Sequence, residues 1–156
     1  GFLFQEKIRE RKLNVDAVQN YEIDKCYYQN IKNGKDITLD DGRVIENSKL
    51  TFDPVPPLSF AFCSDTVYNE NIISIIKGVD VLYHESTFLD SEEALAGKTM
   101  HCTAKEAATI ALKANVKQLV LGHYSTRYDS IELFREQAET IFPNVLLAED
   151  GKSFEF

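Results

Sequence analysis

The chain has 156 residues, of which 44% are hydrophobic and 27% charged, an ordinary composition for a globular domain with a buried core. No apolar run approaches the roughly 20 residues that span a bilayer, and no signal peptide is recognisable, so we expect no membrane segment. The net charge is −8, and residues 51–156 carry the whole deficit with eight basic and sixteen acidic side chains, which by itself disfavours binding to nucleic acid.

Cysteine and methionine usage add two expectations. Three cysteines without CxxC spacing (Cys26, Cys63 and Cys102) disfavour a disulfide framework or a four-cysteine zinc site, and a reducing cytoplasm is the simplest setting. The only methionine is Met100, and the chain starts with an apolar, strand-like stretch. We therefore expect it to be a fragment of a longer protein.

The first part of the chain predicts short elements in mixed order. We expect a strand over residues 2–6, a basic stretch over 7–12, a short helix over 15–21, an aromatic and basic segment over 26–35 and a hairpin over 36–45. The Asp-Asp-Gly at 40–42 supplies the turn between the two alternating runs of the hairpin. Prolines at 54, 56 and 57 predict a stiff connector to the second part of the chain.

From residue 58 onward, apolar strands alternate with helices. Strands are predicted over residues 58–63, 79–83, 117–121, 145–148 and 153–156, and helices over 69–77, 91–97, 103–115 and from 129 or 130 to about 142. The helix after residue 102 opens on the capping box Thr103-Ala-Lys-Glu106, and Asp129 or Ser130 caps the last helix. This alternation predicts an α/β layer with a mainly parallel sheet.

Polar side chains that suit metal chemistry come after three of these strands. Asp65 follows the first, His84 and Glu85 the second, and His123 the third, while His101 stands in a loop. The carboxyl ends of parallel strands share one sheet edge, where sites of open α/β sheets are built. Asp and His are zinc ligands, and a second histidine backed by a carboxylate can act as a general acid. The pattern therefore predicts a metal-assisted hydrolase.

Four motifs in this order and spacing resemble a known family. They are Phe-Cys-Ser-Asp-Thr (62–66), Val-Leu-Tyr-His-Glu-Ser-Thr-Phe (81–88), His-Cys-Thr (101–103) and Leu-Gly-His-Tyr-Ser-Thr-Arg-Tyr (121–128). Together with residues 31–34 and 38–43 they resemble the second half of the ribonuclease Z family, in the metallo-β-lactamase superfamily. The resemblance implies half of an αββα sandwich, with residues 1–156 as the C-terminal part of one domain and an arm-like insertion at about 7–50.

The resemblance also implies roles for single residues. Asp65 corresponds to the carboxylate that bridges two zinc ions, and His123 to the terminal histidine ligand of the second zinc. His84 and Glu85 occupy a His-Glu-Ala-Thr motif in which Ser86 replaces Ala. His101 opens a His-Ser-Thr loop in which cysteine replaces serine. These two motifs are implicated in handling the scissile phosphate and in protonating the leaving 3′ oxygen, so His101, Glu85 and His84 are the expected catalytic residues.

Two parts of the family pattern are absent from this chain. The His-x-His-x-Asp-His motif and a later single histidine ligand are expected upstream of Gly1, and Asp24–Gln29 stands where the arm has a Gly-Pro step. For the full-length protein the resemblance implies a cytoplasmic, homodimeric, zinc-dependent endoribonuclease that removes the 3′ trailer of precursor tRNA. With two candidate metal ligands left, Asp65 and His123, we expect the chain alone to be inactive and to bind zinc weakly.

Each of these residues also has a structural interpretation. Asp65 could cap a helix, His123 could be a turn residue, His84 with Glu85 could be an exposed polar pair, and His101 an ordinary loop residue. Two other functions stay open. One is a different hydrolase of the superfamily, such as a phosphodiesterase or an arylsulfatase, and the other is a non-catalytic α/β binding module without metal.

Overall fold

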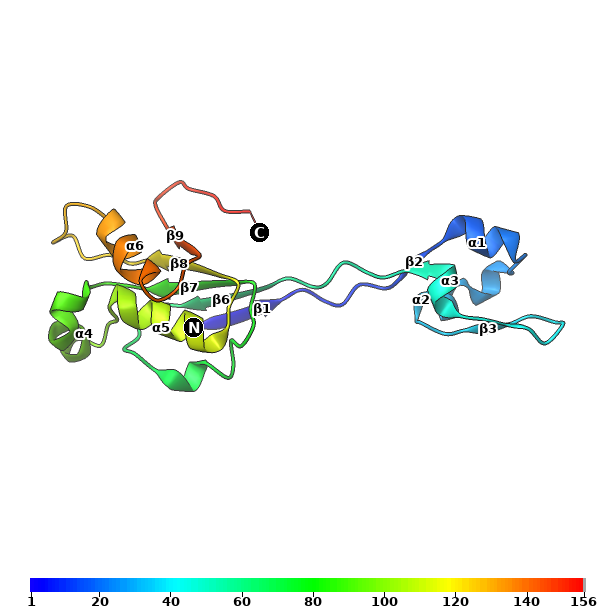
Figure 1. Ribbon diagram of the computed structural model, residues 1–156, viewed down its shortest axis with the longest axis horizontal. Helices are drawn as coiled ribbons and strands as arrows, with labels where there is room; N and C mark the ends of the chain where they lie inside the picture. Colours follow the sequence, from blue (N-terminus) through cyan, green and yellow to red (C-terminus); the bar gives the residue numbers. More distant parts are fainter. Residues whose placement is uncertain (156) are drawn as a thin grey trace. The chain divides into compact units, whose positions relative to one another are not determined.

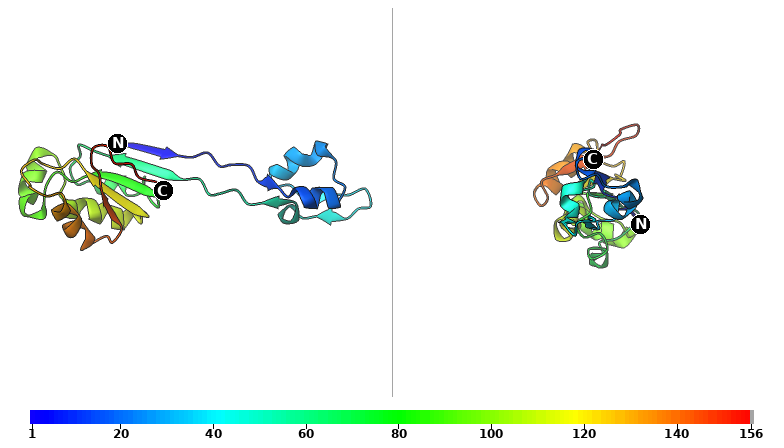
Figure 2. Two further views of the ribbon diagram at one scale, coloured as in Figure 1. Left: turned by 90° about the horizontal axis from the view of Figure 1, so that it is seen from above. Right: turned by 90° about the vertical axis from the view of Figure 1, so that its right-hand side faces the viewer.

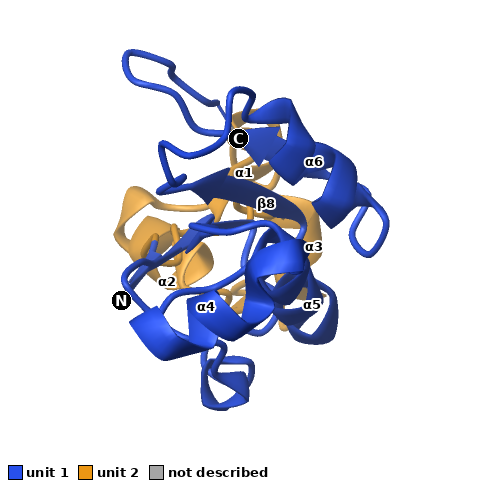
Figure 3. Ribbon diagram, turned by 90° about the vertical axis from the view of Figure 1, so that its left-hand side faces the viewer, with its two compact units in different colours: residues 1–5, 58–156 blue, residues 6–57 orange. Residues whose placement is uncertain are grey.

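The computed structural model describes residues 1–155, which divide into two compact units (Figure 3). Unit 1 contains Gly1–Gln5 and the chain from Leu58 onward, and unit 2 contains Glu6–Pro57. Unit 2 is wider at both ends than the insertion expected at about 7–50. That this segment is an insertion into a single domain remains a prediction.

Unit 1 is built on a five-stranded mixed sheet in the order β1-β6-β7-β8-β9 (Figure 1). The strands are β1 (Phe2–Gln5), β6 (Ser59–Cys63), β7 (Val81–Glu85), β8 (Gln118–Gly122) and β9 (Val145–Leu147). The last four run parallel, while β1 pairs antiparallel with β6 and lies beside it (Figure 2). The predicted α/β class and the mainly parallel sheet are confirmed.

Helices of unit 1 connect the parallel strands. They are α4 (Glu93–Thr99), α5 (Ala104–Ala114) and α6 (Glu132–Glu139), with the 3-10 turns η2 (Glu70–Ile72) and η3 (Asp90–Glu92). The capping box that opens α5 is confirmed, because the Thr103 hydroxyl accepts from the Glu106 amide and the Glu106 carboxylate accepts from the Thr103 amide. The helix ends at Asn115 in the left-handed conformation.

The core of unit 1 lies between the sheet and helices α5 and α6. Alternate strand residues point to this side, so Ala61, Leu82, Leu119 and Leu147 pack against the alanine-rich face of α5 and against Phe134 of α6. Small residues on α5 bring the helix axis close to the sheet. This packing holds the strand ends that carry the site in register.

Three predicted elements of unit 1 differ from the structure. Residues 69–77 form only η2 and turns, because Asn69 caps a short 3-10 turn and the β-branched residues after it, which include Ile72 and Ile73, are weak helix formers. Helix α6 starts later than expected: Ile131 is its N-cap, and the Ser130 hydroxyl only accepts from the Glu132 amide. Residues 153–155 form no strand, and Phe156 lies outside the described residues.

Unit 2 has its own small core. Its elements are β2 (Lys12–Leu13), α1 (Val15–Asn20), η1 (Lys25–Tyr27), α2 (Tyr28–Lys32), β3 (Ile37–Thr38), β4 (Val44–Ile45), α3 (Asn47–Leu50) and β5 (Thr51–Phe52). The expected hairpin is confirmed as β3 paired with β4, with Gly42 at φ +84° in its turn. Buried Asn47, the first residue of α3, donates to the carbonyls of Ile31 and Lys35 and so ties α3 to α2 and to the loop after it.

Among residues 1–155, no helix is long and apolar enough to cross a membrane.

Candidate metal centre

Four polar side chains meet where β6, β7 and β8 end. Asp65 follows β6, Glu85 ends β7, His123 follows β8, and His101 comes from the loop between α4 and α5. One ligand atom from each lies within 4.8 Å of those of the other three. The parallel order of the strands brings residues 58 positions apart in the chain to one edge, as the sequence pattern predicts.

Backbone conformation sets both predicted metal ligands apart. Asp65 has φ +50° and His123 has φ +61°, in the left-handed region that non-glycine residues seldom adopt. Glu22, Met100 and Asn115 share this conformation, but they lie at or just beyond the ends of helices α1, α4 and α5, where it is expected. Neither Asp65 nor His123 ends a helix. Strain of this kind gathers at functional sites, where the side chain has to be aimed.

Glu85 is the buried anchor of the site. Its carboxylate is fully buried and accepts four hydrogen bonds: from the Thr66 amide at 2.6 Å, the Thr87 hydroxyl at 2.7 Å, His101 Nδ1 at 2.9 Å and the Cys102 amide at 3.1 Å. A carboxylate offers about four lone-pair positions, and these donors occupy them. Glu85 is therefore an orienting residue and is not free to bind a metal.

The hydrogen bonds also keep this carboxylate ionised. Burial by itself would raise the pKa of Glu85, but the donors, with Thr87 and His101 first among them, outweigh it and hold the pKa below its usual range. Because an ionised carboxylate only accepts, the proton between it and His101 belongs to Nδ1 of the histidine. The other ring nitrogen, Nε2, is then the atom that His101 can offer to a substrate.

Asp65 and His123, the two predicted metal ligands, face each other on one side of the cluster. The Asp65 side chain is 74% exposed, and its Oδ1 lies 3.3 Å from Nε2 of His123. Two ligands at 2.0–2.2 Å from one tetrahedral zinc ion lie about 3.3–3.6 Å apart, so this pair fits the group. The His101 and His123 rings lie 5.2 Å apart between their centroids, which places the predicted proton donor beside the predicted metal ligands.

His84, the remaining residue expected to be catalytic, is not part of this cluster. It is 1% exposed, and its register with Cys63 and Leu121 places it on the helix-covered side of the sheet. Its Nδ1 donates to the Glu85 carbonyl at 2.8 Å, whereas Nε2 has no partner among the described residues. Burial lowers the pKa of His84, so the ring is kept neutral. This geometry favours a packing role.

Cys102 supports the loop that carries His101. It stands where the family that the chain resembles has serine. Its thiol donates to the Thr66 carbonyl at 3.0 Å, and its amide donates to Glu85. Burial, followed by the charges of Glu106 and Glu85, raises the pKa of the thiol. The thiol therefore stays protonated and is not a thiolate ligand.

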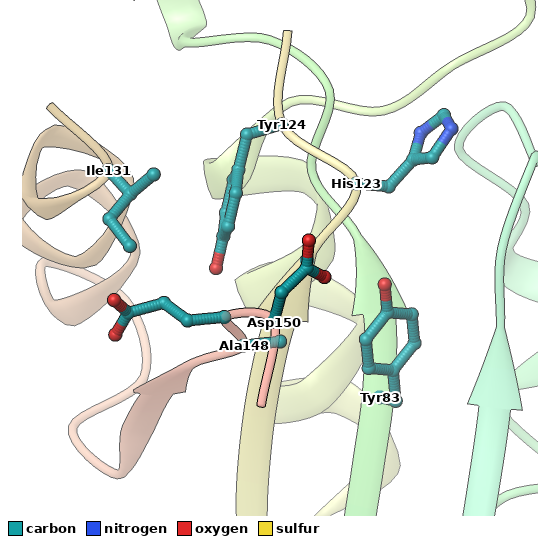
Figure 4. A pocket seen from close by; sticks show the side chains of 8 residues that line it. Tyr83, His123, Tyr124, Ile131, Ala148 and Asp150 are labelled. Carbon is teal, nitrogen blue, oxygen red and sulfur yellow. The ribbon is translucent and has the colours of Figure 1, made fainter. Parts of the chain in front are cut away.

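A pocket of about 540 Å³ opens beside His123 (Figure 4). Tyr83, His123, Tyr124 and Asp150 line it, and the Tyr83 hydroxyl points toward His123 (Figure 4). The Tyr83 ring lies close to the backbone of Gly122, since a Cβ there would be 2.7 Å from two ring carbons. Glycine at this position thus lets the phenol approach the site.

Sequence reasoning missed the threonines that support the site. Thr66 and Thr87 each come after a strand inside the motifs that carry the resemblance, but the pattern alone gives neither of them a role. Thr87 bonds both Glu85 and His123, with its hydroxyl 2.9 Å from Nδ1 of His123. The available signal was the position of Thr87 two residues after Glu85, at the same strand end.

The curated proteins to which this chain is similar in sequence share one name, ribonuclease Z. No protein-family model matches the chain. It is 44% identical over 151 residues to ribonuclease Z of Parabacteroides distasonis, covering 97% of this chain and 50% of the relative. It is 47% identical over 150 residues to ribonuclease Z of Phocaeicola vulgatus, covering 96% and 48% respectively. The chain thus spans about half the length of the curated relatives it matches.

Solved structures place the fold. The metallo-β-lactamase fold protein YhfI from Bacillus subtilis matches 63% of this chain and 40% of its own with a TM-score of 0.59 at 24% identity, which bears on the fold alone. A long form ribonuclease Z from yeast matches 60% of this chain and 13% of its own with a TM-score of 0.54 at 27% identity. The expected metallo-β-lactamase fold is confirmed.

Proposed function

Because the chain belongs to the ribonuclease Z family, we propose that the whole protein is an endoribonuclease that removes the 3′ trailer of precursor tRNA. One observation carries this proposal for the chain itself. Asp65 and His123 face each other at zinc-ligand spacing, beside a histidine whose Nδ1 is held by a buried carboxylate. A metal pair and a proton donor are what metal-assisted hydrolysis of a phosphodiester needs.

We propose zinc as the metal, with Asp65 and His123 as the ligands that this chain contributes. As in the family, two ions per site would draw their remaining ligands from sequence outside this chain. A bound zinc ion supplies a Lewis acid for the phosphate and lowers the pKa of water. Asp65 suits the bridging role because its carboxylate offers two oxygens and is largely exposed.

His101 is the proposed general acid. Its Nδ1–H is held by Glu85, so the proton it can give is on Nε2. Water adds to the phosphorus and gives up a proton to solvent as the bond between phosphorus and the 3′ oxygen breaks. The electron pair of the broken bond stays on the 3′ oxygen, which takes the proton from Nε2. Glu85 does not touch the substrate; it keeps the ring oriented.

Unit 2 is the proposed tRNA-binding arm. Nine basic side chains lie in residues 6–57, and within the described chain Lys32 and Lys35 form no ion pair. Tyr27 is 45% exposed and lies near them in sequence. We propose that these side chains contact the tRNA backbone, and that the enzyme acts as a cytoplasmic homodimer in which one subunit's arm serves the partner's site.

A different hydrolase of the same fold is the main alternative, because the YhfI match shows that fold without naming a substrate. The full-length protein should cleave precursor tRNA at the 3′ side of the acceptor stem and lose this activity with a chelator. Asp65→Ala should lose both metal and cleavage, while Asp129→Ala, also an exposed acid, should lose neither. Cleavage of simple phosphodiesters without cleavage of precursor tRNA would favour the alternative. A metal-free, inactive protein would favour a binding module.

A further inference from the structure

Thr87 lies between the buried anchor and the candidate metal ligand. Its hydroxyl oxygen is 2.7 Å from Oε2 of Glu85 and 2.9 Å from Nδ1 of His123. The residue is itself buried, and it follows β7 at the same sheet edge as the other site residues. One hydroxyl thus joins a carboxylate that binds no metal to a histidine that faces the metal position.

The direction of both hydrogen bonds follows from counting protons. A hydroxyl has one proton to donate and can accept through its lone pairs. The Glu85 carboxylate is ionised and can only accept, so the Thr87 proton points to Glu85. The Thr87 oxygen is then the acceptor in its contact with His123, and Nδ1 of His123 carries the proton.

The proton on Nδ1 determines whether Nε2 of His123 is a donor or an acceptor. With the proton on Nδ1, the neutral ring has its lone pair on Nε2, the atom 3.3 Å from Oδ1 of Asp65. Two acceptors that face each other at this distance can bind one cation between them. The contact therefore matches a pair of ligands prepared for one metal ion.

We propose that Thr87 is a positioning residue that holds His123 in its Nδ1–H form, so that Nε2 points its lone pair at the metal shared with Asp65. Through Thr87, one buried carboxylate orients two histidines. Glu85 holds His101 directly and His123 through the hydroxyl. The inference rests on the proposed metal centre, but not on the identity of the RNA substrate.

Three substitutions at Thr87 separate this role from simple packing. Thr87→Val keeps the shape and removes the hydroxyl, Thr87→Ala removes it without adding bulk, and Thr87→Ser retains it. The matched control is Thr109→Val on α5, where the lost hydroxyl donates only to the Lys105 carbonyl of its own helix. Because alanine fits wherever threonine does, at least one hydroxyl-free variant should fold.

Zinc affinity of the full-length protein is measured by competition with a chromophoric chelator. Loss of such an outer hydrogen bond typically weakens metal binding about 10–100-fold, which is the effect expected for Thr87→Val and Thr87→Ala. Thr87→Ser and Thr109→Val should stay within about threefold of the parent protein. Unchanged affinity in both hydroxyl-free variants would overturn the proposal.

A second readout uses the metal-free protein and no substrate. Nitrogen-15 NMR of the histidine rings, with His123 assigned by a His123→Gln variant, reports which nitrogen carries the proton. The parent and Thr87→Ser should show Nδ1–H at His123, and the hydroxyl-free variants a mixture of both forms. Nε2–H in the parent would overturn the proposal. If the protein binds zinc as described but does not cleave precursor tRNA, the proposed ribonuclease function is wrong, whereas the proposed role of Thr87 in positioning His123 is retained.

Discussion

At the scale of single residues, neighbours of similar chemistry have different roles because their surroundings differ. Asp65 and Glu85 are both carboxylates at one sheet edge, yet the first is mostly exposed and the second is buried under four donors. His101 and His84 likewise differ in exposure to solvent, because His101 is partly exposed and His84 is buried. A charged group without partners is costly to bury, so the number of hydrogen-bond donors distinguishes buried Glu85 from exposed Asp65, the proposed metal ligand.

Removing the His101 ring should slow cleavage and leave metal binding intact. We expect His101→Ala in the full-length protein to lose about 10²–10⁴-fold in single-turnover rate, the usual contribution of a general acid. Its zinc content should be normal, because Asp65 and His123 are untouched. Lys98→Ala, an exposed neighbour on α4, is the control. Normal turnover would end the catalytic role, and lost zinc would make His101 a ligand.

Burial of His84 should make stability fall in mild acid. Burial holds its folded pKa below the ordinary value of 6.5, so above pH 6.5 the ring is neutral in both states and adds no pH dependence. As pH falls below 6.5, the unfolded chain takes up the proton first, and the unfolding free energy decreases until pH reaches the folded pKa. Urea unfolding between pH 7.5 and 5 should show this loss, and His84→Gln should reduce it. Equal slopes in both proteins would contradict the assignment.

At the scale of elements, the sequence predicted a helix correctly where it contained a capping residue, an apolar face and a C-terminal stop signal together. Helix α5 has a capping box, an apolar face of alanines and a left-handed Asn115 at its end, and its predicted bounds agree closely with the structure. The stretch 69–77 has an apolar character but no such signals, and it forms the 3-10 turn η2 followed by turns. Apolar residues alone do not distinguish a helix from a packed loop.

Gly122, the last residue of β8, should not tolerate a side chain. A Cβ there would overlap the Tyr83 phenol, so Gly122→Ala must displace the ring or the strand that positions His123. We expect destabilisation of about 1–3 kcal/mol, as for overpacked sites. Gly97→Ala on α4, where a Cβ meets nothing within 4 Å, should be neutral or stabilising by about 0.5–1 kcal/mol. Urea unfolding of both variants tests this, and equal stabilities would refute it.

At the scale of the molecule, the sheet of unit 1 has one face covered by helices and one with aromatic rings on it. This aromatic face consists of Phe2, Phe4, Phe60, Phe62 and Tyr83, with ring contacts from strand to strand. Phe2 is 68% exposed and Phe4 57%. Exposed apolar patches of this kind mark surfaces that another partner covers. In the αββα sandwich that the family resemblance implies, a second sheet covers this face.

The 156-residue chain on its own should therefore self-associate. Sedimentation velocity should show a mass that rises with concentration, driven by burial of the aromatic face. A Phe2→Ser and Phe4→Ser double variant should reduce the association. Leu112→Ser, which removes a 53% exposed apolar side chain from α5, should leave it unchanged. A monomer at every concentration would contradict the prediction that the aromatic face drives self-association.

The sequence by itself determined the α/β order of elements, the family and four of the residues that meet at the site. Strand periodicity and a parallel order suffice for this, since they place Asp65, Glu85 and His123 at one edge. Only the tertiary structure showed which of them is exposed enough for the proposed metal and which is held by buried donors. Exposure, donor count and the Thr87 bridge depend on contacts between segments distant in the chain, which no local pattern encodes. His84 illustrates the limit, because the pleat of β7 turned it away from Glu85 and into the core.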